Sequence, residues 1–415
     1  MGRRWNKAGA VIERRMMKKF VITGITLIFS GALLLPVAGC VRETKETKPD
    51  VSELNRWLEL LNVIPERNET FRDVQIDTTS GVYIQDMAYL EEKHTEFPDA
   101  EPYAVSRLSI IGRSGLFSHY FDMTDPEADI EGEYQETIGF TFDDVDQMVS
   151  SGTQPYIYET YRGRFDKAEV DTAVKTGTRS EDLEVIQYGG MEYYRWGEDN
   201  AANLSARTHV RPLGRGHRLA LPGYFAFWTV WDEGIETMID CYNDTTGSLA
   251  DINEFKLMAE GLSILDAFSG YMTTNTNSYD EVKEYLEREE LPEREGHDER
   301  FELYLEEVSL LKPYTALATG AGLDGDGYYL AIVLVNPDSR TAEKNASLLE
   351  ERIGNTMDIW QGRLWSEMAT GVTVESRDRL TLAKLYGAPS EFWPDRFGSL
   401  EVVGTGAFEP LLVHE

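Results

Sequence analysis

The sequence predicts an α+β fold in which antiparallel sheets, built from β-hairpins, carry helices packed on one face. Three observations favour this class. Aromatic and β-branched segments occur in pairs joined by two-residue turns, amphipathic segments follow these pairs, and 41% of the residues are hydrophobic, which supplies a core. Strands joined by such short turns must be antiparallel, because parallel neighbours need a long crossover.

Three hairpins are predicted. The segments LEVIQY and MEYYRW flank Gly189-Gly190, a dipeptide that accepts positive φ at both positions. The segments HRLAL and YFAFW flank Pro222-Gly223. A third hairpin is expected over 314–335, where YTALATG and YYLAIVLV surround a turn at Leu323–Gly327.

Helices are expected where apolar residues recur every three or four positions. The first runs from Val51 and stops at Pro65. Asp166, with Glu169 three residues later, begins a second helix that ends at Gly177. Further helices follow the last two hairpins, so that a hairpin and a helix occur over 217–242 and again over 314–353. This recurrence suggests two similar sub-domains.

Charge marks the expected domain boundary. Residues 279–308 are dominated by Glu, Arg and Lys, with Leu and Tyr at helical intervals and a break at Pro292. We therefore predict a first α+β domain over 51–278, a charged helical connector over 279–310 and a second α+β domain over 311–415.

The N-terminus has the pattern of a secretory signal. Basic residues precede an apolar run from Phe20 to Leu35, and small residues then lead to Cys40. We assign 1–39 to a signal peptide. Residues 1–15 form an over-long start, since Met16 and Met17 directly precede the Lys pair. Residues 40–50 are polar after Cys40 and are expected to be a tether.

Val37-Ala38-Gly39-Cys40 resembles the lipobox of prokaryotic lipoproteins. The resemblance implies cleavage before Cys40, a diacylglycerol on its thiol, and a lipid-anchored protein on the extracytoplasmic side of the cell membrane. The segments GRFDKAEVDTAV, SLADINEF and AIVLVNPDSRTAEKNASLLEERI also look like exported prokaryotic lipoproteins of uncharacterised function. That likeness implies an α+β fold and supplies no catalytic residue.

The composition limits the partners. The formal net charge is −33, from 73 acidic and 40 basic residues, and such a field repels nucleic acids and anionic lipid headgroups. We expect contact with the membrane through the lipid anchor alone, no nucleic acid, and an unknown ligand or protein partner. With Cys40 lipidated, Cys241 is alone, so no disulfide is expected.

No motif predicts a cofactor, a metal or a catalytic residue. Gly320–Gly325 matches the spacing G-x-G-x-x-G, but a dinucleotide fingerprint needs a helix next and a strand-like segment follows. The clustered carboxylates of Asp324–Gly327 are possible calcium ligands. However, position 335 is Val where an EF-hand has Glu, so a hairpin turn is favoured. The six histidines lack the spacing of a zinc protease helix.

One basic cluster stands out in this acidic chain as a candidate site for an anion or a partner protein. Arginine forks bind carboxylate and phosphate in a bidentate manner, so an exposed cluster could hold an acidic ligand. The alternative is that the cluster pairs internally with the abundant carboxylates. Its members are Arg207, His209, Arg211, Arg215, His217 and Arg218.

The functional expectation is a membrane-anchored, non-catalytic binding or interaction module. A tether raises the effective concentration of the folded part near the membrane, which suits capture of ligands or neighbouring proteins. The alternative is a surface-bound hydrolase without a recognisable motif, because catalytic groups can converge from distant positions.

Overall fold

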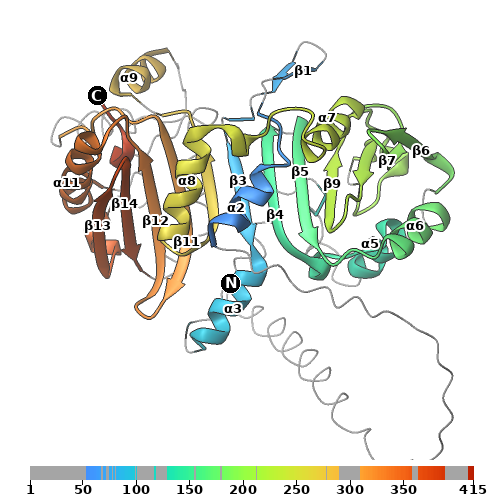
Figure 1. The fold of residues 1–415 in the computed structure, drawn as a ribbon, viewed down its shortest axis with the longest axis horizontal. Helices are drawn as coiled ribbons and strands as arrows, with labels where there is room; N and C mark the ends of the chain where they lie inside the picture. Colours follow the sequence, from blue (N-terminus) through green and yellow to red (C-terminus); the bar gives the residue numbers. More distant parts are fainter. Residues whose placement is uncertain are drawn as a thin grey trace, which may run out of the picture. The chain divides into compact units, whose positions relative to one another are not determined.

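The folded part of the chain is built on one twelve-stranded sheet (Figure 1). The strands follow the order β13-β14-β12-β11-β10-β3-β4-β5-β9-β8-β7-β6, and all neighbours are antiparallel. β1 and β2 form a separate ribbon. The structure is a computed structural model, and it describes residues 410–415 and 53–387 except 67–68, 72–73, 77, 80, 99, 101–115, 118–128, 154–155, 178–179, 212, 277, 289–308 and 358–362.

Most strands are joined in sequential pairs. Their bounds are β1 (Glu69–Phe71), β2 (Val74–Ile76), β3 (Val82–Asp86), β4 (Val145–Thr153), β5 (Tyr156–Gly163), β6 (Leu183–Tyr188), β7 (Met191–Trp196), β8 (His217–Ala220), β9 (Phe225–Thr229), β10 (Ala267–Thr273), β11 (Ala316–Asp324), β12 (Gly327–Val335), β13 (Gly371–Arg377) and β14 (Leu380–Tyr386).

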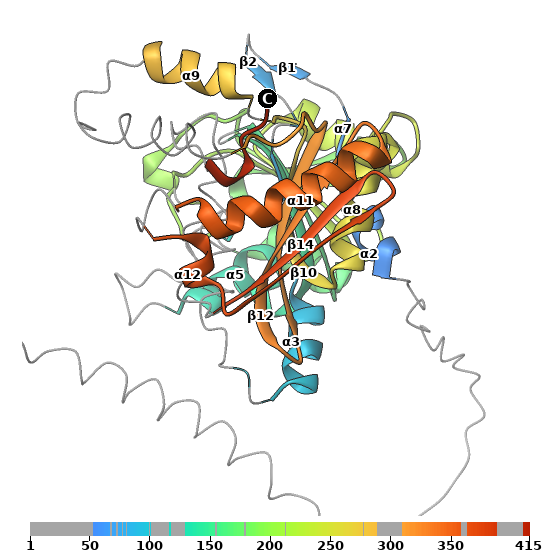
Figure 2. The same ribbon diagram turned by 90° about the vertical axis from the view of Figure 1, so that its left-hand side faces the viewer.

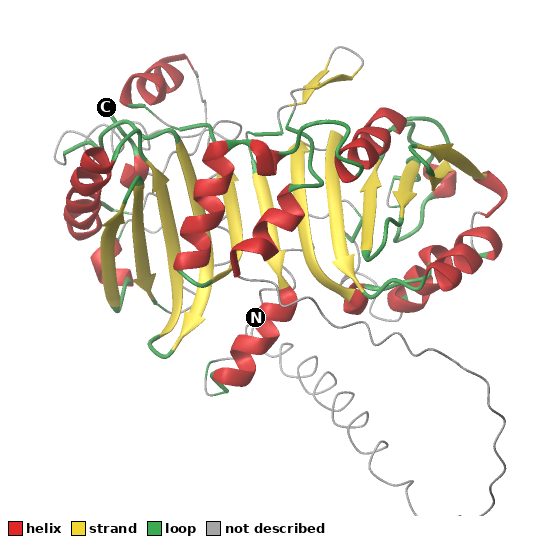
Figure 3. Cartoon of the chain, in the orientation of Figure 1, coloured by secondary structure: helices red, strands yellow, loops and turns green. Residues whose placement is uncertain are grey.

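Along the chain, most helices come between these strand pairs, and Figure 3 shows where they lie against the sheet. The α-helices are α2 (Glu53–Leu61), α3 (Met87–Glu96), α5 (Ile130–Ile138), α6 (Lys167–Thr176), α7 (Asp232–Tyr242), α8 (Asn253–Ile264), α9 (Tyr279–Arg288), α11 (Ser339–Asn355) and α12 (Trp365–Met368). Short 3-10 turns are η1 (Phe142–Asp144), η2 (Ser180–Asp182), η3 (Leu204–Ala206), η4 (Leu249–Asp251) and η5 (Pro410–Leu412).

The α+β class predicted from the sequence is confirmed, and β12 shows how its sheet is buried. Because successive side chains of a strand point to opposite faces, Ala331 and Val333 enter the core cluster that contains α8 residues. Ile332 and Leu334 enter a second cluster with Leu349 of α11. Figure 2 shows α11 running across β14. This part of the sheet therefore carries helices on both faces, which refines the expectation of one covered face.

The three predicted hairpins are confirmed. β6 and β7 turn at Gly189-Gly190, whose φ angles of 56° and 85° suit the two-residue turn. β8 and β9 pair around Pro222-Gly223, and β11 and β12 pair from Ala316↔Val335 to Asp324↔Gly327. The helix that follows Asp166 is also confirmed, because this carboxylate accepts hydrogen bonds from the Ala168 and Glu169 amides.

The glycine-rich segment around 320–325 serves packing. Gly320 and Gly322 lie within β11, and a Cβ at Gly322 would stand 2.0 Å from the Tyr329 hydroxyl oxygen. The Asp324 carboxylate accepts hydrogen bonds from Lys384 Nζ at 2.9 Å and from the Tyr386 hydroxyl at 3.0 Å. The hairpin interpretation of this segment therefore agrees with its contacts.

The predicted boundary at 279–310 does not separate two sheets. β10 precedes this segment and β11 follows it, and the two strands pair directly in the one sheet. Residues 51–415 accordingly form one compact unit. Residues 279–288 form α9, in which Asp280, Glu281 and Glu284 are exposed and Val282 is buried. The second predicted helix, after Pro292, lies outside the described residues.

The predicted signal peptide at 1–39 and the predicted tether at 40–50, including Cys40, also lie outside the described residues. None of the described helices combines the length and the apolar character needed to cross a membrane.

Candidate recognition surface

The loop between β7 and β8 carries most of the predicted basic cluster. We call residues 203–215 the Leu-Arg loop; all of them except position 212 are described. The Leu-Arg loop begins with Asn203, whose side-chain oxygen accepts a hydrogen bond from the Ser205 amide and so starts the turn η3. It closes where the Asn203 amide donates to the Leu213 carbonyl at 3.2 Å.

Backbone contacts fix the conformation of the Leu-Arg loop. The amides of Thr208 and Arg211 donate to one another's carbonyl oxygens at 3.1 and 3.2 Å, and the Gly214 amide donates to the Arg211 carbonyl at 2.8 Å. Gly214 has φ +59°, and a Cβ there would lie 1.8 Å from the Asn203 carbonyl oxygen. Only glycine fits this close approach, so Gly214 is required where the two ends of the Leu-Arg loop meet.

Arg211 stabilises the Leu-Arg loop from inside. Its side chain is buried, with Nε donating to the Arg215 carbonyl at 2.8 Å and Nη2 donating to the Gly214 carbonyl at 3.3 Å. The guanidinium therefore supplies hydrogen-bond donors to two loop carbonyls that burial removes from water. Arg211 is a structural residue of the loop and not part of an exposed basic surface.

Two leucines are exposed where the Leu-Arg loop closes. Leu204 is 70% exposed and Leu213 is 43% exposed, and the backbone contact between Asn203 and Leu213 brings these positions together. Arg207 is exposed on the same loop and Arg215 is half-buried. Among the described residues, Arg215 Nε has no hydrogen-bond acceptor. The loop thus carries two exposed leucines and the exposed Arg207.

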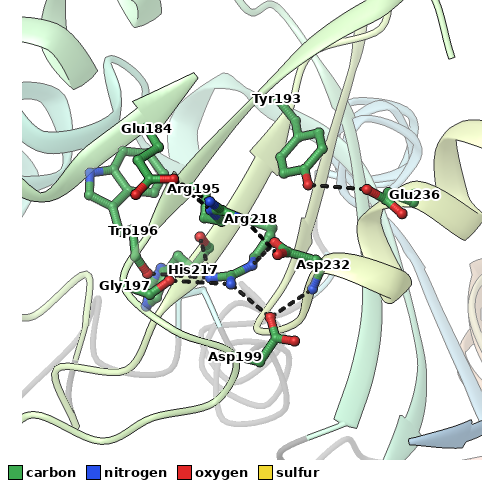
Figure 4. A network of polar contacts seen from close by, with 10 residues as sticks. All are labelled: Glu184, Tyr193, Arg195, Trp196, Gly197, Asp199, His217, Arg218, Asp232 and Glu236. Carbon is green, nitrogen blue, oxygen red and sulfur yellow. Dashed lines mark hydrogen bonds and ion pairs between the residues drawn. The ribbon is translucent and has the colours of Figure 1, made fainter. Parts of the chain in front are cut away.

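Arg218 lies away from this surface, at the centre of the network in Figure 4. Its side chain is 1% exposed, with Nε donating to Asp232 at 2.6 Å and Nη2 donating to Asp199 at 2.7 Å. Arg195 reaches the other oxygen of Asp232 at 2.8 Å and also pairs with Glu184 (Figure 4). The buried guanidinium is therefore neutralised internally, as the alternative interpretation of the cluster requires.

His217 is a core residue. Its Nδ1 accepts a hydrogen bond from Trp228 Nε1 at 3.1 Å, which requires a neutral imidazole. Burial, with the nearby charges of Arg211 and Arg218, holds the pKa of His217 well below its usual range. His217 therefore does not contribute a charge to a binding surface.

His209 is held by a carboxylate of α5. Its Nδ1 lies 2.6 Å from Glu133 Oε2, and its backbone amide donates to Glu133 Oε1 at 2.7 Å. Both side chains keep about a quarter of their surface exposed, at 27% for His209 and 26% for Glu133. Glu133 thus fixes the orientation of the imidazole and attaches the Leu-Arg loop to α5.

A second concave surface lies at α5 and α6. It is an open groove of about 800 Å³ with carboxylates and threonines on its walls. The Asp166 carboxylate at its margin is used as the cap of α6. Its lining comprises Gln135, Glu136, Asp166, Ala168, Glu169, Thr172, Ala173, Thr176 and Gly177.

The six residues predicted as one site are therefore divided by the fold. Arg207 and Arg215 remain at the surface, His209 is partly exposed, and three residues are buried: Arg211, His217 and Arg218. Sequence reasoning missed Leu204 and Leu213, which lie in an Arg-containing segment without helical or strand periodicity. An apolar residue in such a segment is the signal that could have identified them.

No family model and no curated protein matches the chain. Among solved structures it is similar to TP0453 in crystal form I, with a TM-score of 0.33 and 9% identity over 79% of this chain and 91% of that one. For crystal form III of TP0453 the TM-score is 0.34 and the identity 10%, over 79% of this chain and 93% of that chain. No family is assigned by these matches.

Proposed function

We propose that the protein is an extracytoplasmic lipoprotein, anchored through Cys40, whose folded part binds an acidic partner through the Leu-Arg loop. The observation that supports the binding role is that Leu204, Leu213 and Arg207 are all exposed on one loop whose backbone is held by internal hydrogen bonds. Arginine is enriched at protein–protein contact sites, and exposed leucines add apolar area that is buried favourably on contact.

Charge defines the partner further. The chain carries a formal net charge of −33, so a basic partner would be attracted to many regions of its surface and not to one site. The Leu-Arg loop is a local exception, because its exposed charges are positive. It therefore selects a partner that combines an apolar pocket with carboxylates.

The test is site-specific photo-crosslinking of the full chain in its own cells, with a photoreactive amino acid at Leu204. We expect a defined crosslinked product that weakens at least several-fold when Arg207→Ser and Arg215→Ser are combined. A probe at Val372, which is 38% exposed on β13, is the matched control and should give no such product. Equal products from both positions, or none from Leu204, would refute the binding role.

The anchor is tested in the same cells. Cys40→Ser should move the protein from the membrane fraction into the soluble fraction, because the lipid is attached at that thiol. The crosslink from Leu204 should then weaken if tethering raises the effective concentration near the partner. A Cys40→Ser protein that stays in the membrane fraction would contradict the anchor.

One observation favours the second candidate, a surface-bound hydrolase. The imidazole of His209 is oriented by Glu133 at 2.6 Å, which is the relation of a general base to its orienting group. Turnover in a general hydrolase screen that is lost in His209→Gln would favour this function over binding. The Leu-Arg loop ranks first because its exposed side chains already form a surface.

A further inference from the structure

The last strand of the sheet has an open side. β6 ends the strand order, and within the described chain β7 is the strand that pairs with it (Figure 1). An end strand presents a row of backbone N–H and C=O groups that can pair with another chain. β6 is therefore a candidate interaction surface, separate from the Leu-Arg loop.

The register shows which backbone groups point outward. In a hairpin with a two-residue turn, the residues that flank the turn bond to each other, here Tyr188 and Met191. Alternation then directs the backbone of Ile186 and Glu184 toward β7. The N–H and C=O groups of Leu183, Val185 and Gln187 consequently face away from the sheet.

β6 has little of the usual protection of a sheet edge, because its one charged side chain, Glu184, is 60% exposed but already paired with Arg195 of β7. Its sequence LEVIQY has no Lys and no Pro, its pairing with β7 has no bulge, and Val185 is 41% exposed. The opposite edge, β13, differs. Glu375 and Arg377 place charges there with more than half of each side chain exposed, and α11 packs against the strand.

The sequence of β6 is complementary to itself in antiparallel orientation. A twofold axis through Val185 places Val185 opposite its own copy, Leu183 opposite Gln187, and Glu184 opposite Ile186. No like charges stand directly opposite, and Glu184 is already paired with Arg195. The residues with outward backbone groups are the ones that meet in this register, as an antiparallel ladder requires.

We propose that a second copy of this chain pairs with β6 across a twofold axis at Val185, joining two twelve-stranded sheets edge to edge. A twofold contact closes on itself, whereas pairing β6 with β13 would generate an open filament. The proposal does not depend on the partner proposed for the Leu-Arg loop.

The net negative charge of the chain opposes this dimer and makes its stability depend on salt concentration. Two chains of net charge −33 repel each other, and salt screens repulsion beyond about 8 Å at physiological ionic strength. A six-residue edge also falls at the low end of interface sizes, below about 1,200 Å². The dimer is therefore weak, and it strengthens as salt is raised.

The test is sedimentation velocity on the full chain carrying Cys40→Ser, from micromolar to submillimolar concentration. The parent should shift from monomer to dimer with rising concentration, and Val185→Pro should remain monomeric. Proline removes only the outward N–H at this position, so the β6–β7 pairing is preserved. Val372→Pro, at an exposed position of β13, is the matched control and should dimerise like the parent.

A charge exchange tests the register without proline. Val185→Lys and Val185→Glu should each lose the dimer, because like charges then meet on the twofold axis, and a mixture of the two variants should regain it. A parent that is monomeric at every concentration overturns the proposal. So does dimerisation that survives Val185→Pro, that is lost in Val372→Pro, or that fails to return in the mixture.

Discussion

Toward one end of the sheet, residues 330–335 of β12 send aliphatic side chains into both faces, whereas toward the other end β7 sends tyrosines into both. Ile332 and Val333 of β12 lie in separate hydrophobic clusters on opposite sides of the strand. Tyr193 and Tyr194 of β7 are equally buried, but the Tyr193 hydroxyl donates to Glu236 of α7 and the Tyr194 hydroxyl donates to Asp171 of α6.

The difference lies in how helices are fixed to a strand. Aliphatic burial is non-directional and roughly proportional to area, so the contacts of Val333 with the α8 side and of Ile332 with the α11 side depend on fit. Tyrosine–carboxylate contacts are directional and bring ionisable groups into the interior. Burial raises the pKa of Glu236, for example, and nearby carboxylates add to this effect. We therefore expect the β7 end to respond to charge and pH, and the β12 end to respond to volume.

The largest effect is expected for Arg218→Ala, which should lower the free energy of unfolding by about 3–5 kcal/mol. The substitution leaves Asp199 and Asp232 without the buried guanidinium that neutralises them. Urea denaturation followed by tryptophan fluorescence measures the loss. If Arg218→Ala left the free energy of unfolding unchanged, the contrast between the two ends of the sheet would fail.

Arg195→Ala is the matched control, because Arg195 also pairs with Asp232 and its side chain is 30% exposed. Water can replace this partly exposed contact, so we expect a loss of about 0–1 kcal/mol. If the two arginine variants lost the same free energy, burial would not be what distinguishes Arg218.

The second prediction concerns pH and His217. The pKa of His217 is lowered by burial in the folded protein, whereas an unfolded histidine titrates near pH 6.5. Below that pH the unfolded chain binds a proton that the folded chain does not, so stability falls as pH falls. The slope contributed by this residue is about 1.4 kcal/mol per pH unit until the folded pKa is reached.

His217→Gln should remove this contribution, because glutamine does not titrate and its oxygen can accept the Trp228 indole proton. The measurement is urea denaturation of both proteins at pH 7.5 and pH 5.5. Other groups titrate in this range, so the relevant quantity is the difference between the two proteins in their loss of stability. Equal losses of stability in the two proteins would mean that His217 does not contribute to the pH dependence.

The same contrast explains what the sequence could predict. Hairpins, caps and strand periods depend on neighbours in the chain, so Gly189-Gly190 and Asp166 located their turn and helix start correctly. The pairing of β10 with β11 joins strands that are separated by the charged segment, and no local pattern encodes it. The basic cluster was predicted as one surface, yet Arg218 is buried because Asp199 and Asp232 meet it from two other segments.

The smallest effect is expected for Ile332→Val at the aliphatic end. Ile332 is 1% exposed within the cluster that contains Leu349 and Ile353 of α11, and the substitution removes one methylene group from it. The lost transfer and packing energy should lower the free energy of unfolding by about 0.5–1.5 kcal/mol. Because the cluster is formed by apolar side chains, the same loss should be found at pH 7.5 and pH 5.5 in the urea experiment used for His217. A loss that changes with pH would mean that the aliphatic and polar ends are coupled through the sheet, and the contrast between them would fail.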